Sequence, residues 1–401
     1  MYHCAYYEAS LAGLDKLRGI LLNNGFSTLG KILSVIVSVA CIIFLVYMNL
    51  NDRVREQQAA EEVAAVNEDT RETEKEIAQA EAEEKAAALE EKRESDSFYQ
   101  KLKDGFDVKI LVVGDTIANG YGASSADATW FNLVKKSIEE QYNVGVTMDN
   151  VSILDSGAYA SYARVKMEED EDYDLTLICT GANDSEETLP VYYEALLRAI
   201  RDTFTRCSAI SIQEYMESEN NAKNMTIQSL STAYNALSAD VYSQMVADPT
   251  PYMQDGGYLN DAGHQLYADT VMSVIKKGVE DGMEYAVTQT APIYTETLKF
   301  DQFLYVPADM FTRTGRQYVI ETSLTGIVAI DFDVYPGDNS FDLYLDRVKS
   351  ASLVLTNAIS TPVEHIELIE GEVKANRRVG VIFATEEVAD SFRGMCVTTT
   401  E

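Results

Sequence analysis

The sequence has 401 residues, of which 46% are hydrophobic and seven are proline, so it is too long for one ordinary domain and too apolar for a disordered chain. Its 65 acidic residues against 32 basic ones give a formal charge of -33, which repels phosphate backbones and excludes nucleic acid as an expected partner. The five cysteines are odd in number and lack metal-ligand spacing, so we expect neither a disulfide framework nor a metal site. No cofactor is expected either.

The first element expected is a membrane-spanning helix at residues 32–50, ILSVIVSVACIIFLVYMNL, which contain no charge. As a helix it would span roughly 28 Å, close to the hydrocarbon thickness of a bilayer. A buried core helix is the alternative, but it would normally be shorter and show a polar face. The segment starts too far from the N-terminus for a typical cleaved signal peptide and lacks a small-residue cleavage site, which favours a signal-anchor.

The orientation of this helix depends on charge and on size. Basic residues flank both ends, with Lys16, Arg18 and Lys31 before it and Arg53 and Arg55 after it, so the positive-inside count favours a cytoplasmic N-terminus only weakly. The large acidic C-terminal part is typical of a translocated domain. We therefore expect a single-pass protein of the cell membrane, with residues 1–31 cytoplasmic and the C-terminal domains extracytoplasmic.

Residues 51–104 are rich in Ala, Glu, Lys, Gln and Arg, and the run EKEIAQAEAEEKAAALEEKRE holds strong helix formers without Gly or Pro. Val63, Val66, Ile77 and Ala80 fit the a/d rhythm of a coiled coil, but large apolar residues are sparse. A solvated single helix and a weak homodimeric stalk therefore both stay open. Either one would act as a spacer of roughly 70 Å.

Residues 105–284 alternate short apolar strands with helices. The strands expected are in KILVVGDT, VSILDSG, DLTLICTGAND and SAISIQEYM, and the helices include TWFNLVKKSIEEQY and VYYEALLRAIRDTF. Strands that are apolar throughout indicate a parallel sheet covered on both faces. The expected fold class is therefore a three-layer α/β domain.

Residues 285–401 lack helical patterns and carry β-branched and aromatic runs such as IVAIDFDVY and FDLYLDRV. Turn sequences such as PGDN and KANR separate these runs. This pattern predicts an all-β, sandwich-like domain that follows the α/β domain.

Four segments of the α/β domain carry candidate chemistry. In VVGDTIANGYG, Thr116 follows a strand and a Gly-Asp turn and opens a helix, which exposes its hydroxyl beside helix N–H groups. Three further segments follow strands or open a helix. They are Ser156-Gly157, Gly181-Ala182-Asn183-Asp184, and QDGGYLNDAGHQLYADTV at residues 254–271.

Together and in this order, over roughly residues 107–280, the four segments resemble the motif blocks of the SGNH (GDSL-type) hydrolases. The resemblance implies a flavodoxin-like α/β fold and an acyl-transfer site. It implies that Thr116 occupies the nucleophile position and that Gly157 and Asn183 serve the oxyanion hole. It also implies that Asp255 is the orienting acid and that Tyr258 stands where the family has its catalytic histidine.

Two departures from this family pattern point to a degenerate site. The nucleophile position holds threonine, whose methyl group stiffens the side chain and crowds attack on a carbonyl, although threonine is a nucleophile elsewhere. The base position holds Tyr258, and a phenol with a pKa near 10 is a poor proton acceptor compared with an imidazole near 6.5. Asp255 is then left without the histidine it would orient.

His264 is the alternative base, because Asp261-Ala262-Gly263-His264 also reads DxxH. In the family, however, a histidine at this place starts the last helix and is not the base. The other two histidines, His3 and His365, lie in other regions of the chain.

The sequence predicts a catalytically degenerate binding or scaffolding module for cell-envelope glycan processing, with a glycan or an envelope protein as its partner. An active esterase or O-acetyltransferase on cell-surface polysaccharide, using Thr116, is the alternative. A structural subunit of a membrane complex is the third hypothesis.

Overall fold

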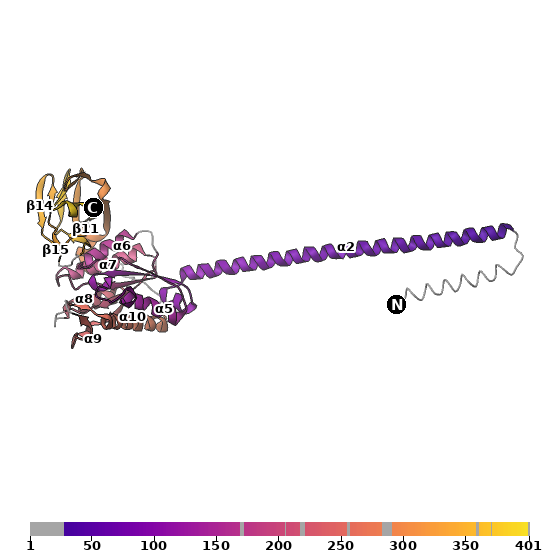
Figure 1. The fold of residues 1–401 in the computed structure, drawn as a ribbon, viewed down its shortest axis with the longest axis horizontal. Helices are drawn as coiled ribbons and strands as arrows, with labels where there is room; N and C mark the ends of the chain where they lie inside the picture. The colour runs from indigo at the N-terminus through magenta and orange to yellow at the C-terminus, as the bar shows by residue number, and fades with distance from the viewer. Residues whose placement is uncertain are drawn as a thin grey trace. The chain divides into compact units, whose positions relative to one another are not determined.

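The computed structural model describes residues 28–168, 172–204, 206–216, 221–254, 257–282, 291–357, 361–369 and 371–399 (Figure 1). The chain divides into two compact units, Met1–Glu90 and Glu91–Glu401. Each unit is considered by itself below.

The first element is the helix α2, Thr28–Ser95, which is 68 residues long. Its apolar N-terminal part has a window of mean hydropathy 2.5, and none of that window is buried. Large side chains such as Leu33 and Ile43 are 65% and 64% exposed. Exposed apolar surface of this length is unfavourable in water, so α2 is a candidate single membrane span by length and composition.

The second unit begins with the short helix α3, Phe98–Asp104, which is capped by Ser97 and ends at Gly105. Phe98, Tyr99 and Leu102 are buried in the core of the α/β domain. The stalk predicted for residues 51–104 therefore overlaps the folded domain at its C-terminal end.

The α/β domain is built on a five-stranded parallel sheet in the order β2-β1-β3-β4-β5. Its strands are β1 (Val108–Gly114), β2 (Val146–Asn150), β3 (Leu175–Cys179), β4 (Ser208–Gln213) and β5 (Leu237–Asp240). Every side chain of β3 and β4 is buried, including the polar Thr176 of β3 and Ser208, Ser211 and Gln213 of β4, as expected for a sheet covered on both faces. This order is the flavodoxin-like one, and it confirms the predicted fold class.

Helices cover both faces of this sheet. The core on one face includes side chains of α3, α5 (Trp130–Tyr142) and α10 (Asp261–Asp281). The core on the other face includes side chains of α6 (Ala158–Met167), α7 (Leu189–Thr203) and α8 (Ala222–Ala233). In an open sheet of this order, ligands bind at the carboxyl ends of the strands where the order reverses, which here is between β1 and β3.

The C-terminal domain consists mainly of two antiparallel sheets, as predicted. One has the order β14-β13-β18-β10-β9, and the other has the order β16-β11-β19-β8 with β17 paired to β11. The strands are β8 (Gln302–Pro307), β9 (Thr312–Thr314), β10 (Gln317–Ile320), β11 (Leu324–Val334), β13 (Phe341–Leu345), β14 (Val348–Leu353), β16 (Val363–Leu368), β17 (Val373–Ala375), β18 (Val379–Phe383) and β19 (Gly394–Thr399). Aromatic and β-branched side chains of both sheets form one apolar core.

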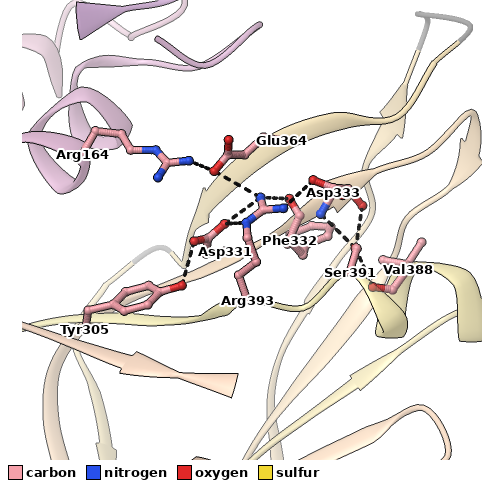
Figure 2. Close-up of polar contacts among 9 residues, drawn as sticks. All are labelled: Arg164, Tyr305, Asp331, Phe332, Asp333, Glu364, Val388, Ser391 and Arg393. Carbon is pink, nitrogen blue, oxygen red and sulfur yellow. Dashed lines mark hydrogen bonds and ion pairs between the residues drawn. The ribbon is translucent and has the colours of Figure 1, made fainter. Parts of the chain in front are cut away.

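The two domains of the second unit share a junction on the side of the sheet that carries α6 and α7 (Figure 1). The Tyr162 hydroxyl of α6 donates a hydrogen bond of 2.8 Å to the Phe300 carbonyl. Arg164 of α6 forms an ion pair with Glu364 of β16, which also contacts Arg393 (Figure 2). The junction is therefore both apolar and ionic.

The buried Glu194 of α7 holds the segment that enters the C-terminal domain. Its carboxylate accepts hydrogen bonds from the backbone N–H groups of Ile293 and Tyr294 and from the hydroxyls of Thr297 and Tyr234, at 2.5, 2.9, 2.8 and 2.6 Å. Four donors on one buried carboxylate offset the cost of removing its charge from water.

Candidate functional site

The Thr116 turn lies at the carboxyl end of β1, where the order of the sheet reverses. β1 ends at Gly114, which has a φ of 148° and where a Cβ would lie 1.8 Å from the Cys179 carbonyl oxygen, so only glycine fits. Asp115 then caps the short helix α4, Thr116–Asn119, by accepting a hydrogen bond of 3.0 Å from the Ile117 N–H. Thr116 is the first residue of that helix, as the motif predicts.

The Thr116 hydroxyl pairs with Asp155, a residue that the sequence reasoning missed. Thr116 Oγ1 donates to Asp155 Oδ1 at 3.0 Å, and the Asp155 backbone N–H donates to Thr116 Oγ1 at 2.9 Å. Asp155 has a φ of 56°, a left-handed conformation that turns its backbone towards Thr116. The available signal was an acidic residue directly before Ser156-Gly157.

Asn183 and Gly157 lie on the two neighbouring loops. The Asn183 amide donates a hydrogen bond of 2.9 Å to the Ser156 carbonyl oxygen. Gly157 precedes α6, and the Asp184 carboxylate accepts from the next N–H, that of Ala158, at 2.8 Å. A Cβ on Gly157 would lie 2.8 Å from Asp184 Oδ1, so the close approach of these loops requires glycine there.

Two buried carboxyl groups, Asp115 and Glu214, lie beneath the Thr116 turn. Glu214 accepts from the Ala182 N–H at 2.8 Å and from the Cys179 thiol at 3.6 Å. Burial raises the pKa of Glu214 to about 7. Burial, together with the nearby Glu214 carboxylate, raises the pKa of Asp115 well above its ordinary value. The pair therefore holds a proton at neutral pH.

A pocket of about 250 Å³ opens above this pair. The rings of Tyr121 and Tyr258 meet edge to face at its wall, with centroids 4.6 Å apart. Burial, and then the nearby Asp155 carboxylate, raises the pKa of Tyr258, so its phenol stays protonated at neutral pH. The lining residues that bear on chemistry are Asp115, Thr116, Asp155, Asn183, Glu214 and Tyr258.

His264 lies on α10, fully buried, and is not among the residues that line this pocket. Burial lowers the pKa of its imidazole, and a hydrogen bond with the Tyr121 backbone opposes that shift. Asp261, the acid of its DxxH, instead accepts from the Ser124 N–H and hydroxyl at 2.8 and 2.6 Å. The structure does not join His264 to Thr116.

The predicted site residues therefore divide into three groups. Thr116, Asn183 and Tyr258 line one pocket, and Gly157 lies in the loop beside it. His264 lies outside this pocket, and Asp255 lies outside the described residues. Over the part of the chain that the structure describes, no group of three or more His, Cys, Asp or Glu side chains is arranged to hold a metal ion.

Comparison with protein families finds a match to the GDSL-like lipase/acylhydrolase family over residues 112–266. The comparison with curated proteins found no match.

Among solved structures, this chain is similar to a two-domain esterase active on acetylated mannans, co-crystallised with mannopentaose. The similarity covers 77% of this chain and 97% of the esterase, with a TM-score of 0.60 and 16% identity. A second structure of such an esterase covers 75% of this chain and 94% of its own, at a TM-score of 0.60 and 15% identity. A lipase/acylhydrolase from Enterococcus faecalis covers 46% of this chain and 100% of its own, at 18% identity and a TM-score of 0.36. The similarity to the first two shows a shared two-domain fold.

Proposed function

We propose that this chain, whose residues 112–266 belong to the GDSL-like lipase/acylhydrolase (SGNH) family, is a membrane-anchored binding module that holds an acylated glycan without hydrolysing it efficiently. The observation that carries the proposal is the pairing of the Thr116 hydroxyl with Asp155, in a pocket whose lining includes Tyr258 and does not include His264.

The proposal rests first on the missing base. Removal of the proton from a hydroxyl nucleophile needs an acceptor whose pKa lies near the working pH, and loss of that acceptor costs about a millionfold in a well-studied serine hydrolase. A tyrosine with a raised pKa does not accept a proton at neutral pH. Residual acceleration by the oxyanion hole and by binding reaches about 10³-fold over water, so a trace of activity is compatible with a binding role.

The charge of the pocket supports the same proposal. The tetrahedral intermediate of acyl transfer carries an oxyanion, which N–H donors stabilise and carboxylates oppose. Asp155 brings a carboxylate to the Thr116 hydroxyl, whose oxygen would bond to the carbonyl carbon, so a negative charge lies close to the carbonyl oxygen on which that oxyanion would form. A neutral ester can bind there, but its transition state is disfavoured.

An active esterase is the second candidate, and the same 3.0 Å hydrogen bond favours it, because it supplies a proton acceptor to Thr116. In general, a carboxylate is a weaker base than an imidazole. It can serve as a general base only with a correspondingly lower rate.

The ligand class and the location complete the proposal. The two-domain esterase of similar fold acts on acetylated mannans, and we infer that an acylated cell-surface glycan is the ligand here. We place the chain in the cell membrane through α2, with the N-terminus cytoplasmic and the other domains outside. Val63 and Val66 are 60% and 61% exposed on α2, and pairing of two such helices would cover them and give a homodimer.

The test uses the full chain in a mild detergent, with 4-nitrophenyl acetate and acetylated mannan as substrates. We expect acetate release by the parent and by Thr116→Ala to agree within a few-fold, with mannan binding measured by calorimetry retained in both. Thr232→Ala is the matched control, because it removes a hydroxyl from an exposed position on α8.

Two results would decide against a binding module. Turnover that Thr116→Ala abolishes and Thr232→Ala leaves unchanged would show an enzyme. If Asp155→Asn then lowers that turnover at least about 100-fold, Asp155 is its general base.

A further inference from the structure

The C-terminal domain carries a hollow of about 620 Å³ that lies outside the Thr116 pocket. It is formed by the turn between β13 and β14, by the loop between β17 and β18, and by the segment before β11. Three arginines line it, in a chain in which acidic residues outnumber basic ones by 65 to 32. Its lining includes Glu321, Asp346, Arg347, Asn376, Arg377 and Arg378.

The first arginine is held in a tight turn. Asp346 and Arg347 form the two-residue connection between β13 and β14, and their φ values are 51° and 73°. Hairpin turns of this kind favour asparagine and glycine, because both central residues adopt the left-handed conformation. An arginine at this position is unusual, and a residue that is kept in an unfavourable backbone conformation is a candidate for a functional side chain.

Asp346 ties this turn to the loop that carries the other two arginines. Its carboxylate accepts hydrogen bonds from the N–H groups of Asn376, Arg377 and Arg378 at 2.9, 2.8 and 3.1 Å, and from the Asn376 amide at 3.0 Å. Its own N–H donates to the Arg378 carbonyl at 2.8 Å. These bonds hold the pKa of Asp346 below its ordinary value. Asp346 therefore joins the β13–β14 turn to the β17–β18 loop by hydrogen bonds. These bonds fix the spacing of the arginines on the two segments before a ligand binds.

Two of the three guanidinium groups have no acidic partner within the described ranges. Arg378 lies 3.4 Å from Glu321, whereas no contact of the Arg347 or Arg377 side chain with a described residue is found. The other arginines between Glu91 and Glu401 all have polar partners; for example, Arg198 pairs with Asp301. Adjacent unpaired arginines on a rigid support are suited to a carboxylate or a phosphate.

A second hollow, of about 600 Å³, shares Glu321, Thr322 and Arg378 with the first and extends over the outer face of β9 and β10. Thr312, Thr314, Gln317 and Val319 point to this face, because Thr314 pairs with Gln317 and Thr312 pairs with Val319 across the two strands. The backbone groups between these two strands are paired with each other, whereas the outer edge of β9 has no neighbouring strand in this sheet. The hydroxyl and amide side chains on this face suit the hydroxyl groups of sugar rings, and Met310, Val319 and Ile320 add apolar surface.

We infer that these two hollows together form a binding site for an anionic glycan, with Arg347 and Arg377 holding its acidic groups and the β9–β10 face holding neighbouring sugar rings. This site is separate from the Thr116 pocket and does not depend on what that pocket does. It would hold the C-terminal domain on an acidic polysaccharide despite the net negative charge of the chain, since salt screens charges that lie more than about 8 Å away at physiological ionic strength.

The test measures binding of the full chain in detergent to polygalacturonate, an acidic glycan, to poly-glutamate, an acidic polypeptide, and to neutral mannan. The variant combines Arg347→Gly with Arg377→Gln. Glycine favours the left-handed conformation of the turn, so this variant keeps its fold. The control combines Lys276→Gln with Lys277→Gln, which removes the same charge from exposed positions on α10. Thermal unfolding checks both proteins.

We expect polygalacturonate to bind the parent and the lysine control equally. We expect the arginine variant to bind it at least about tenfold more weakly, and binding to weaken from about 0.05 to 0.5 M NaCl. Equal binding by the arginine variant, or equal losses in both variants, would overturn the site. Binding of poly-glutamate as strong as that of polygalacturonate would overturn the glycan as its ligand. Thr116→Ala should bind polygalacturonate as the parent does. The result of this test therefore does not depend on whether the proposal for the Thr116 pocket is right.

Discussion

Arg393 stabilises the C-terminal domain, beside its junction with the α/β domain, through an ionic network centred on the buried Asp331 (Figure 2). Its guanidinium donates to Asp331 at 2.8 Å, to Asp333 at 2.5 Å and to the Phe332 carbonyl at 3.1 Å. Asp331 is 1% exposed, and its other oxygen accepts from the Tyr305 hydroxyl at 2.9 Å. In Arg393→Met the apolar stem remains and the charge is lost, so the Asp331 carboxylate is left buried with one neutral donor.

The magnitude follows from that unpaired carboxylate. Removing one partner of a buried ion pair costs about 3–5 kcal/mol, and we take the lower end because the Arg393 side chain is 35% exposed. An unfolding entropy of about 2.1 cal/mol/K per residue over about 310 residues gives roughly 0.65 kcal/mol/K. The melting temperature should therefore fall by about 5 °C, as measured by calorimetry on the full chain.

Two further variants test the reasoning. Arg377→Met makes the same chemical change at an exposed arginine and should alter the free energy of unfolding by less than about 0.5 kcal/mol. Adding Asp331→Leu to Arg393→Met should recover part of the lost stability, because it removes the unpaired charge. A change in the free energy of unfolding of less than about 1 kcal/mol in Arg393→Met would refute this explanation. So would a double variant in which Asp331→Leu destabilises the Arg393→Met chain by as much as it destabilises the parent.

Three further predictions concern buried groups and the base position. The raised pKa of Glu214, about 7 against an ordinary 4.5, stabilises the fold below pH 4.5, and that stability is lost as pH rises through 7. The free energy of unfolding in denaturant should fall as pH rises over this range, and Glu214→Gln should make that fall smaller. Glu194→Gln leaves one backbone N–H without an acceptor and should cost about 2 kcal/mol, whereas exposed Glu187→Gln should be neutral in thermal unfolding. Thr116→Ser with Tyr258→His should raise nitrophenyl acetate hydrolysis at least about 100-fold, and an unchanged rate would contradict the assigned base position.

The sequence was sufficient for the fold of the α/β domain because its signals are local. Strands such as Leu175–Cys179 are apolar except for Thr176, since both of their faces are buried, and Gly114 is required by its contact with the Cys179 carbonyl. The order of the sheet then brings Thr116, Asn183 and Tyr258 to one pocket. The order of the motifs in the sequence was enough to predict that these three residues lie close together.

The features that the sequence did not predict depend on contacts across long separations. Glu194 looks like an ordinary helix residue until it meets the N–H groups of Ile293 and Tyr294, about 100 positions later. Asp155 looks like a loop residue, because its pairing with Thr116 depends on a left-handed backbone. Arg347 likewise looks like a solvated turn residue. No local pattern encodes these partners.

The missing imidazole and the Asp155 carboxylate both lower the rate of acyl transfer, and their two effects can be measured separately. The Asp155 carboxylate accepts from the Thr116 hydroxyl at 3.0 Å, so it lies close to the developing oxyanion. Two unit charges about 5 Å apart repel by about 3 kcal/mol at an effective dielectric constant near 20. That is a factor of more than 100 in rate. Supplying a base through Thr116→Ser and Tyr258→His therefore removes only one of two obstacles. Adding Asp155→Asn to that pair should raise acetate release at least about tenfold further, whereas Asp202→Asn, on the surface of α7, should leave it unchanged. If Asp155→Asn instead lowers the rate of the repaired chain, the carboxylate assists the reaction, and the esterase with Asp155 as its base becomes the better description of this site.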